Sequence, residues 1–252
     1  MARAAVLGRM SWRVATVVAM HDQTSTARSI VLDVPEWPGH DAGQHVDVRL
    51  TAPDGYSAVR SYSIASAVDG QQIELGVERL PDGEVSPYLA DDLVVGDVLE
   101  IRGPVGGWFV WRPDQPESVQ LIAGGSGVVP LLAMARAHAS VGSRAPIRLL
   151  YSVRDAASIL YGAELDRLSR RGGGLELTYA YTRLAPDGSL RRPGRIDKAL
   201  VADVTWPAAS EPTCYVCGPT AFVETVADLL TAAGHDPARV RTERFGPSGG
   251  PR

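Results

Sequence analysis

The apolar positions of the chain follow two different rhythms. In the N-terminal part, short β-prone runs alternate with turn formers such as Pro38-Gly39 and Asp54-Gly55. The strands predicted from these runs cover residues 12–18, 29–33, 45–50, 62–64, 72–77 and 98–102. Strands this short and this evenly spaced predict a six-stranded antiparallel Greek-key barrel.

The C-terminal part alternates apolar strands with helices. The predicted strands cover residues 119–123, 147–153, 175–181, 213–217 and 240–243, and the predicted helices cover 130–139, 159–171 and 219–233. Continuous apolar strands that alternate with helices predict a five-stranded parallel, Rossmann-like sheet covered on both faces. Residues 112–116 contain two prolines and predict a linker, so the predicted domains are 1–112 and 113–252.

Composition narrows the class of protein. The length of 252 residues allows two domains of ordinary size, and the net charge of −4 argues against nucleic acid as the main partner. No apolar run reaches the roughly 20 residues of a membrane span, and the run at 4–7 is too short for the core of a signal peptide. We therefore expect a cytoplasmic protein that binds neither nucleic acid nor membrane.

The two cysteines, Cys214 and Cys217, both fall in the predicted strand 213–217. Positions three apart on a strand point to opposite faces, which predicts neither a disulfide nor a shared metal. An iron–sulfur cluster needs about four cysteine ligands, so the sequence predicts no metal site.

Candidate phosphate and ring contacts occur in the barrel half. Arg60 and Tyr62 are two residues apart and share one face of a strand, while Ser61 and Ser63 take the other. Taken alone, these residues also suit an ordinary exposed strand. Ser86 precedes Pro87 and a short helical run, which predicts an N-cap at a helix start suited to a pyrophosphate. Arg60 and Ser86 could together clamp that group.

A glycine-rich turn, Gly124-Gly125-Ser126-Gly127, follows the first strand of the second half. Glycines let a backbone approach a pyrophosphate, although tight packing would equally explain them. Where an NAD site usually has an acid, the second strand ends in Ser152-Val153-Arg154. This favours the 2′-phosphate of NADP(H), with NAD(H) as the alternative.

These motifs, in this order, resemble the ferredoxin-NADP reductase family over almost the whole chain. The flavin motif Arg-x-Tyr-(Ser/Thr) matches Arg60, Tyr62 and Ser63, and Gly-x-x-(Ser/Thr) matches Gly83 and Ser86. The glycine turn with Pro130, and Cys217-Gly218-Pro219, match its nicotinamide half. The resemblance implies an FAD-binding barrel followed by an NADP-binding domain.

The resemblance also implies residue roles. Tyr62 would pack on the flavin ring, Ser63 would lie near its N5 atom, Cys217 would lie near the nicotinamide and Phe245 would cover the ring, which makes these four the candidate catalytic residues. Arg183 and Arg195 would join Arg154 at the 2′-phosphate. The implied cofactor-binding set is Arg60, Ser61, Tyr62, Ser63, Val77, Gly83, Val85, Ser86, Gly125, Ser126, Gly127, Ser152, Arg154, Arg183, Arg195, Cys217, Gly218 and Pro219.

The predicted function is hydride transfer from NADPH to bound FAD, followed by electron transfer to a separate acceptor. A ferredoxin or an oxygenase component is the expected redox partner of a monomeric reductase. The alternatives are a reductase of free flavin or ferric complexes, a non-catalytic FAD-binding relay subunit of a larger complex, and a flavin-free binding module.

Overall fold

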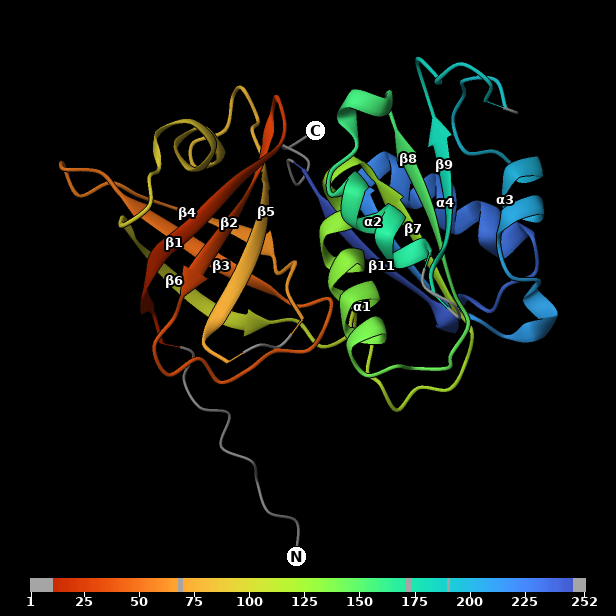
Figure 1. Ribbon diagram of the computed structural model, residues 1–252, viewed down its shortest axis with the longest axis horizontal. Coiled ribbons are helices and arrows are strands. Elements are labelled where there is room, and N and C mark those ends of the chain that lie inside the picture. The colour runs from red at the N-terminus through yellow and green to blue at the C-terminus, as the bar shows by residue number, and fades with distance from the viewer. Residues whose placement is uncertain (1–10, 68–69, 171–173, 190, 247–252) are drawn as a thin grey trace, which may run out of the picture.

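The computed structural model describes residues 11–67, 70–170, 174–189 and 191–246. The run at 4–7 lies outside these ranges. Figure 1 shows an all-β domain beside an α/β domain, so the predicted fold class is confirmed. The predicted boundary at 112/113 falls between the last barrel strand, which ends at Val105, and the first strand of the second sheet, which starts at Val119. The boundary itself stays a prediction.

The first domain is one antiparallel sheet of six strands in the order β4-β3-β6-β1-β2-β5. The strands are β1 (Arg13–Thr24), β2 (Ala27–Asp33), β3 (His45–Thr51), β4 (Ser57–Ser63), β5 (Gln72–Glu78) and β6 (Val98–Val105), with a helical turn η1 (Tyr88–Asp92) between the last two. Alternate residues such as Ile30, Leu32, Val46 and Val48 point inward and are fully buried.

The barrel has one open seam, between the end strands β4 and β5. These strands meet only at an isolated bridge between Ile64 and Leu75. One edge of β4 therefore keeps backbone N–H and C=O groups that no neighbouring strand uses, which leaves them available to a ligand.

The second domain is a parallel sheet in the order β11-β10-β7-β8-β9. Its strands are β7 (Val119–Gly124), β8 (Ile147–Val153), β9 (Glu176–Tyr181), β10 (Thr213–Pro219) and β11 (Val240–Phe245). Its helices are α1 (Val128–Ser140), α2 (Gly162–Ser169), α3 (Lys198–Val204) and α4 (Thr220–Ala232), with short 3₁₀ turns η2 (Gly125–Gly127), η3 (Ala156–Ser158), η4 (Ala208–Ser210) and η5 (Pro237–Arg239).

Each face of this sheet has its own core. Helices α1 and α2 cover the face that also packs against the barrel, with Phe109 and Trp111 in the same cluster, while α3 and α4 cover the other face. Cys217 belongs to the first core and Cys214 to the second, and both thiols are free. The prediction that the two cysteines face opposite ways is confirmed.

Three predicted elements differ from the observed ones, and one observed helix was not predicted. Strand β1 extends to Thr24, beyond the predicted end at residue 18, because it pairs with β2 as far as Thr24. Strand β4 begins at Ser57 rather than at residue 62, because it pairs with β3 along its whole length. The helix predicted from 159 begins at Gly162, since Tyr161 has a left-handed backbone (φ 57°), and its predicted last residue, 171, lies outside the described ranges. Helix α3 was not predicted; Asp197 caps it by accepting a hydrogen bond from the Leu200 N–H.

Candidate functional site

Strand β4 displays the predicted flavin motif at the open seam. In its register with β3, Tyr62 lies opposite Val46 and Arg60 opposite Val48, so both share one face as predicted. Burial raises the pKa of Tyr62, whose ring is partly buried against the barrel core, and the phenol stays neutral. Ser61 lies on the other face, where its hydroxyl donates to Asp47 (2.7 Å).

The turn that contains Gly83 and Ser86 is built differently from the prediction. The Ser86 hydroxyl accepts a hydrogen bond from the Leu80 N–H (3.1 Å), and no side chain caps η1. The predicted N-cap role of Ser86 is therefore wrong, because the hydroxyl closes the preceding turn instead. A Cβ at Gly83 would lie 2.7 Å from the Ser86 Oγ, so the Gly-x-x-Ser spacing follows from this tight turn.

The predicted clamp of Arg60 with Ser86 on a pyrophosphate stays a prediction. The Arg60 guanidinium forms an ion pair with Glu84, whose second oxygen accepts from the Tyr56 hydroxyl (2.8 Å). Arg60, Glu84 and Tyr56 are all exposed. Sequence reasoning missed Glu84, although it lies inside the predicted motif.

Two other members of the flavin set, Val77 and Val85, are fully buried in the barrel core. Their side chains cannot reach a ligand at the seam, which leaves only their backbone atoms for that purpose.

The glycine turn lies where parallel-sheet proteins bind ligands. Strand β7 has β10 and β8 as neighbours, so the strand order reverses there. The turn 125–127 meets the last residues of β10, 217–219, at the carboxyl edge. Gly125 has a φ of +56° and open space where a Cβ would be. At Gly127 a Cβ would lie 2.2 Å from the Cys217 carbonyl oxygen. The close packing against β10 is therefore sufficient to explain why this residue is glycine. Ser126 lies between them, half-buried.

The predicted arginines converge at the ends of β8 and β9. Ser152 is buried in β8, and the Arg154 carbonyl accepts from the Arg183 N–H (2.9 Å). The loop that carries Arg195 returns to β9, where the Gly194 N–H donates to the Tyr181 carbonyl (2.9 Å). Arg154 lies 3.8 Å from Glu78 of the barrel.

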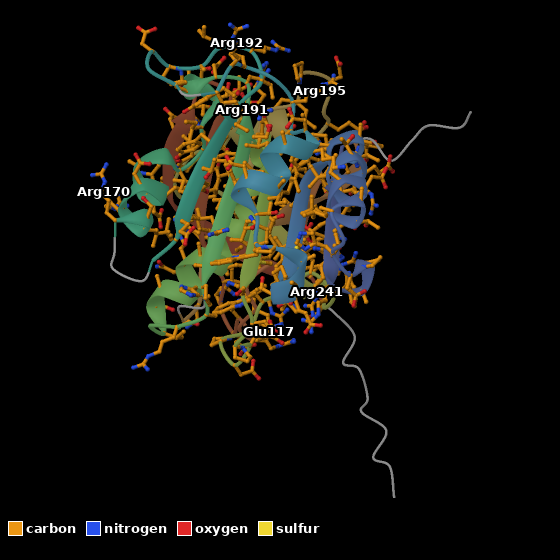
Figure 2. The ribbon with its side chains drawn as sticks, turned by 90° about the vertical axis from the view of Figure 1, so that its right-hand side faces the viewer. Glu117, Arg170, Arg191, Arg192, Arg195 and Arg241 are labelled. Atoms are coloured by element: carbon orange, nitrogen blue, oxygen red, sulfur yellow. The ribbon has the colours of Figure 1, made fainter. Side chains whose placement is uncertain are left out.

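Figure 2 shows Arg191, Arg192 and Arg195 at the same end of this domain, opposite Glu117 and Arg241. Arg191 pairs with Asp197 (2.7 Å), whereas Arg183 and Arg195 are exposed and form no ion pair with any described residue. This end of the domain therefore offers guanidinium groups to an anion.

The candidate catalytic residues meet where the two domains join. Ser63 at the end of β4 lies close to Glu243 on β11, and Glu243 is the register partner of Cys217 on β10. Phe245 lies two residues beyond Glu243 and packs against the core that both domains share. The structure thus brings together Ser63, Cys217 and Phe245, which lie far apart in the sequence.

Glu243 is the acid that sequence reasoning missed at this site. Burial raises its pKa to about 7, against the opposing effect of the Ser63 hydroxyl. Burial, with a further contribution from Glu243, also holds the pKa of the Cys217 thiol well above its ordinary value, so the thiol stays protonated. A neutral thiol thus lies beside a carboxyl group that can exchange a proton near neutral pH.

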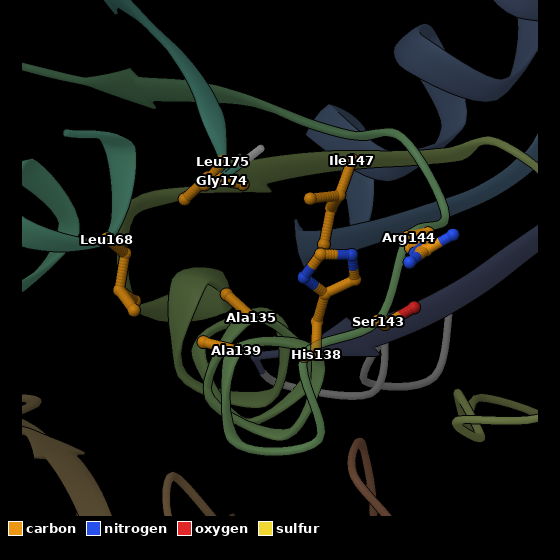
Figure 3. Close-up of a pocket in the computed structure, with 10 residues that line it drawn as sticks. Ala135, His138, Ala139, Ser143, Arg144, Ile147, Leu168, Gly174 and Leu175 are labelled. Atoms are coloured by element: carbon orange, nitrogen blue, oxygen red, sulfur yellow. The ribbon is translucent and has the colours of Figure 1, made fainter. Parts of the chain in front are cut away.

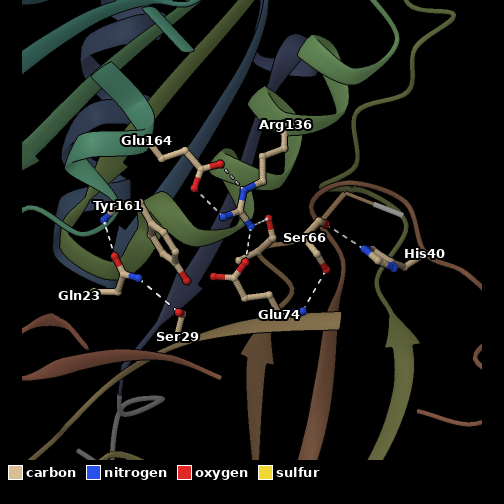
Figure 4. A network of polar contacts seen from close by, with 9 residues as sticks. Gln23, Ser29, His40, Ser66, Glu74, Arg136, Tyr161 and Glu164 are labelled. Carbon is tan, nitrogen blue, oxygen red and sulfur yellow. Dashed lines mark hydrogen bonds and ion pairs between the residues drawn. The ribbon is translucent and has the colours of Figure 1, made fainter. Parts of the chain in front are cut away.

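A buried ion-pair network fixes the domains against each other (Figure 4). Arg136 on α1 binds Glu164 on α2 (2.7 Å) and reaches across to Glu74 on β5 (2.6 Å) and to the Ala65 carbonyl (3.0 Å). Burial by itself would lower the pKa of Arg136, but the two carboxylates outweigh it and raise the pKa. The charge is therefore permanent. Nearby, the Tyr161 N–H donates to Gln23 of the barrel (3.1 Å).

A cavity of about 470 Å³ lies elsewhere, at the amino-terminal end of β8. Figure 3 shows His138 at the end of α1 and Ile147 at the start of β8 lining it. None of the predicted site residues lines this cavity. It is therefore separate from the open seam at β4 and from the carboxyl edge of the parallel sheet, where the cofactor-binding residues are predicted.

The donor set at the seam fits a flavin dinucleotide. A half-buried aromatic ring, a hydroxyl and a guanidinium follow one another along β4, beside unpaired strand-edge backbone groups. In the parts of the chain that the structure describes, no group of three His, Cys, Asp or Glu side chains is placed to bind a metal. No described helix is long and apolar enough to cross a membrane.

The chain matches the Oxidoreductase FAD-binding domain family over residues 12–110 and the Oxidoreductase NAD-binding domain family over residues 121–228. The aromatic O-demethylase reductase subunit of an Amycolatopsis species is 30% identical over 238 residues, which cover 93% of this chain and 69% of that protein. A flavohemoprotein of a Burkholderia species is 30% identical over 82% of this chain. The chain spans only about half that relative's length, since the match covers 51% of it.

Solved structures agree with these matches. The FAD/NAD-binding domain of a nitric oxide dioxygenase from Vibrio cholerae has a TM-score of 0.83 and 27% identity, covering 95% of this chain and 100% of that one. The resemblance predicted from the motifs is thereby confirmed. The chain belongs to the ferredoxin-NADP reductase-like family of flavoprotein oxidoreductases, whose cofactors are FAD and a nicotinamide dinucleotide.

Proposed function

We propose that this chain is the reductase of an oxygenase system, which takes hydride from NADPH onto bound FAD and passes electrons to a separate acceptor protein. When bound, FAD supplies a ring that accepts a hydride and releases electrons one at a time. The protein supplies binding sites and orientation for the two cofactors. The proposal covers what this chain can do, since its flavohemoprotein relative is about twice as long.

The observation that carries the proposal is the meeting of Ser63, Cys217 and Glu243 at the domain junction. Ser63 ends the candidate flavin strand, and Cys217 ends the strand beside the glycine turn. Cofactors bound along these two segments would approach each other there. Correct approach of the reacting atoms is the largest contribution that a protein makes to such a transfer.

At this junction the protein's side chains can orient the flavin and nicotinamide rings. The Ser63 hydroxyl can donate to the flavin edge, and the neutral Cys217 thiol avoids placing a negative charge beside the reacting ring. Tyr62, which packs on the barrel core, gives the flavin ring an aromatic surface. Phe245, which packs on the core of the second domain, would cover the ring from that side.

We propose NADPH rather than NADH as the donor. Arg154, Arg183 and Arg195 lie together at the carboxyl edge, and two of them have no acidic partner among the described residues. The neighbouring Asp155 accepts a hydrogen bond from the Ser158 hydroxyl (2.7 Å) at one of its two oxygens, and NADH, whose ribose hydroxyls an acid could hold, stays the alternative donor.

The acceptor is proposed to be an oxygenase component or a ferredoxin. The name of the Amycolatopsis relative, an aromatic O-demethylase reductase subunit, supports this choice. Reduction of free flavin or ferric complexes is the second candidate, because it needs no partner protein. Monomeric state and a cytoplasmic location stay predictions from the sequence.

Anaerobic reduction tests the first half of the proposal. The purified protein, supplied with FAD, should be yellow and should lose its flavin absorbance on addition of stoichiometric NADPH. A protein that neither retains nor binds FAD would contradict the proposed function.

A panel of acceptors tests the second half. NADPH oxidation is measured with an oxygenase-type ferredoxin, with ferric citrate and with free riboflavin. The proposal expects the protein acceptor to give the highest kcat/KM. A clear preference for ferric citrate or riboflavin would replace it with the second candidate.

A further inference from the structure

Glu84 binds the arginine that the flavin phosphates need. Its carboxylate is paired with the Arg60 guanidinium, and Arg60 also donates to the Val59 carbonyl (2.8 Å). In the proposed FAD site this guanidinium is the positive charge on the flavin face of β4. A diphosphate therefore finds its cation already neutralised by a side chain of the same protein.

Glu84 is held in this position from both sides. Its second oxygen accepts from the Tyr56 hydroxyl, and the Tyr56 N–H is itself fixed by Asp54 (3.0 Å). The backbone of Glu84 is set by the tight turn at Gly83, where Ser86 and Leu80 close the loop. Arg60 and Glu84 remain 51% and 47% exposed, so this ion pair is not buried. An exposed pair of this kind is weak enough for a ligand to displace.

We infer that Glu84 competes with the FAD diphosphate for Arg60 and thereby weakens the binding of the flavin. The inference rests on the proposed FAD site. When FAD binds, the phosphate oxygens replace the Glu84 carboxylate at the guanidinium, while Tyr56 retains the released acid close by. The freed carboxylate then also repels the phosphates. Both effects lower the affinity and favour exchange of FAD with solvent.

The test is a double-mutant cycle on FAD affinity, measured by flavin fluorescence with the full chain stripped of flavin. Glu84→Gln should tighten the dissociation constant of FAD about tenfold and slow FAD release. Arg60→Met should weaken binding, and in the Arg60→Met background Glu84→Gln should tighten it by clearly less than tenfold, because only the repulsion remains to be removed. Glu36→Gln is the matched control, since Glu36 is an exposed barrel acid whose side chain bonds to no described residue.

The possible outcomes separate the inference from the site on which it rests. If Arg60→Met weakens FAD binding but Glu84→Gln leaves it unchanged, the competition is refuted and the FAD site stands. An equal gain from Glu84→Gln with and without Arg60 also refutes the competition, because the effect is then repulsion alone. If Arg60→Met leaves FAD binding unchanged, the FAD site itself is wrong.

Discussion

The ion pairs at the domain junction differ in burial from those at the two predicted cofactor sites, the open seam at β4 and the carboxyl edge of the parallel sheet. At the junction, Arg136, Glu74 and Glu164 are largely buried and satisfy one another. At the edges, Arg60 and Arg154 are about half exposed and pair with single acids that a ligand could replace. Buried pairs lock a geometry, whereas exposed pairs leave cations available for phosphates. The molecule thus separates the groups that position the cofactors from the groups that bind them.

Removing the junction cation should have the largest effect. Arg136→Met leaves two carboxylates buried without a partner, and we expect the free energy of unfolding to fall by about 3 kcal/mol. Urea unfolding followed by circular dichroism measures this change.

The matched control for this variant is an exposed pair. Arg28→Met breaks the contact with Asp22, which is 73% exposed, and should cost at most about 0.5 kcal/mol. Equal losses in the two variants would remove the distinction between the junction and the surface.

The next effect concerns the pH dependence of stability through Glu243. The pKa of its carboxyl group is about 7 in the folded protein, whereas the pKa of a glutamate in an unfolded chain is about 4.3. The folded state binds the proton more tightly, so this contribution to stability is complete below about pH 4 and is lost as the pH rises through 7.

Glu243→Gln does not titrate and removes this dependence. Its free energy of unfolding, relative to that of the unmodified protein, should rise by about 2 kcal/mol between pH 5.5 and pH 8, again measured in urea. A constant difference for Glu243→Gln would mean that its carboxyl is hydrated in the folded protein.

A smaller effect is expected at the exposed nicotinamide edge. Arg154→Ala and Arg183→Ala should each raise the KM for NADPH about tenfold and the KM for NADH less than threefold, because each removes a charge-assisted contact to the 2′-phosphate. Steady-state kinetics with both donors measures this. Arg170→Ala, an exposed arginine placed away from this edge, is the control. Equal increases in the KM for NADPH and the KM for NADH would contradict the proposed contact between these arginines and the 2′-phosphate.

The sequence was sufficient to predict those features that depend on the spacing of residues along a single strand or helix. The shared face of Arg60 and Tyr62 follows from the two-residue repeat of a strand, and the opposite orientations of Cys214 and Cys217 follow from it as well. The two sheets were predictable for the same reason, since their apolar strands differ in length and spacing.

The sequence failed where a polar group had several possible partners. The Ser86 hydroxyl could cap a helix or close a turn, and only the folded position of Leu80 decides between them. Glu243 looks like any acid of a terminal strand until β10 and the Ser63 end of β4 enclose it. Glu84 could be assigned only after β4 and the turn at Gly83 had been placed together.

The smallest effect tests whether the glycine turn binds phosphate or only packs. Gly125→Ala puts a Cβ into open space at a φ of +56°, so it should cost about 1 kcal/mol of stability through backbone strain. Gly142 has a φ of +60° and equally open surroundings at the far end of α1, so Gly142→Ala should cost the same. If the Gly125 turn approaches the pyrophosphate of NADPH, only Gly125→Ala should also raise the KM for NADPH, by a few fold. Thermal unfolding and NADPH kinetics on the two variants give this comparison, and an unchanged KM in Gly125→Ala would assign the turn to packing alone.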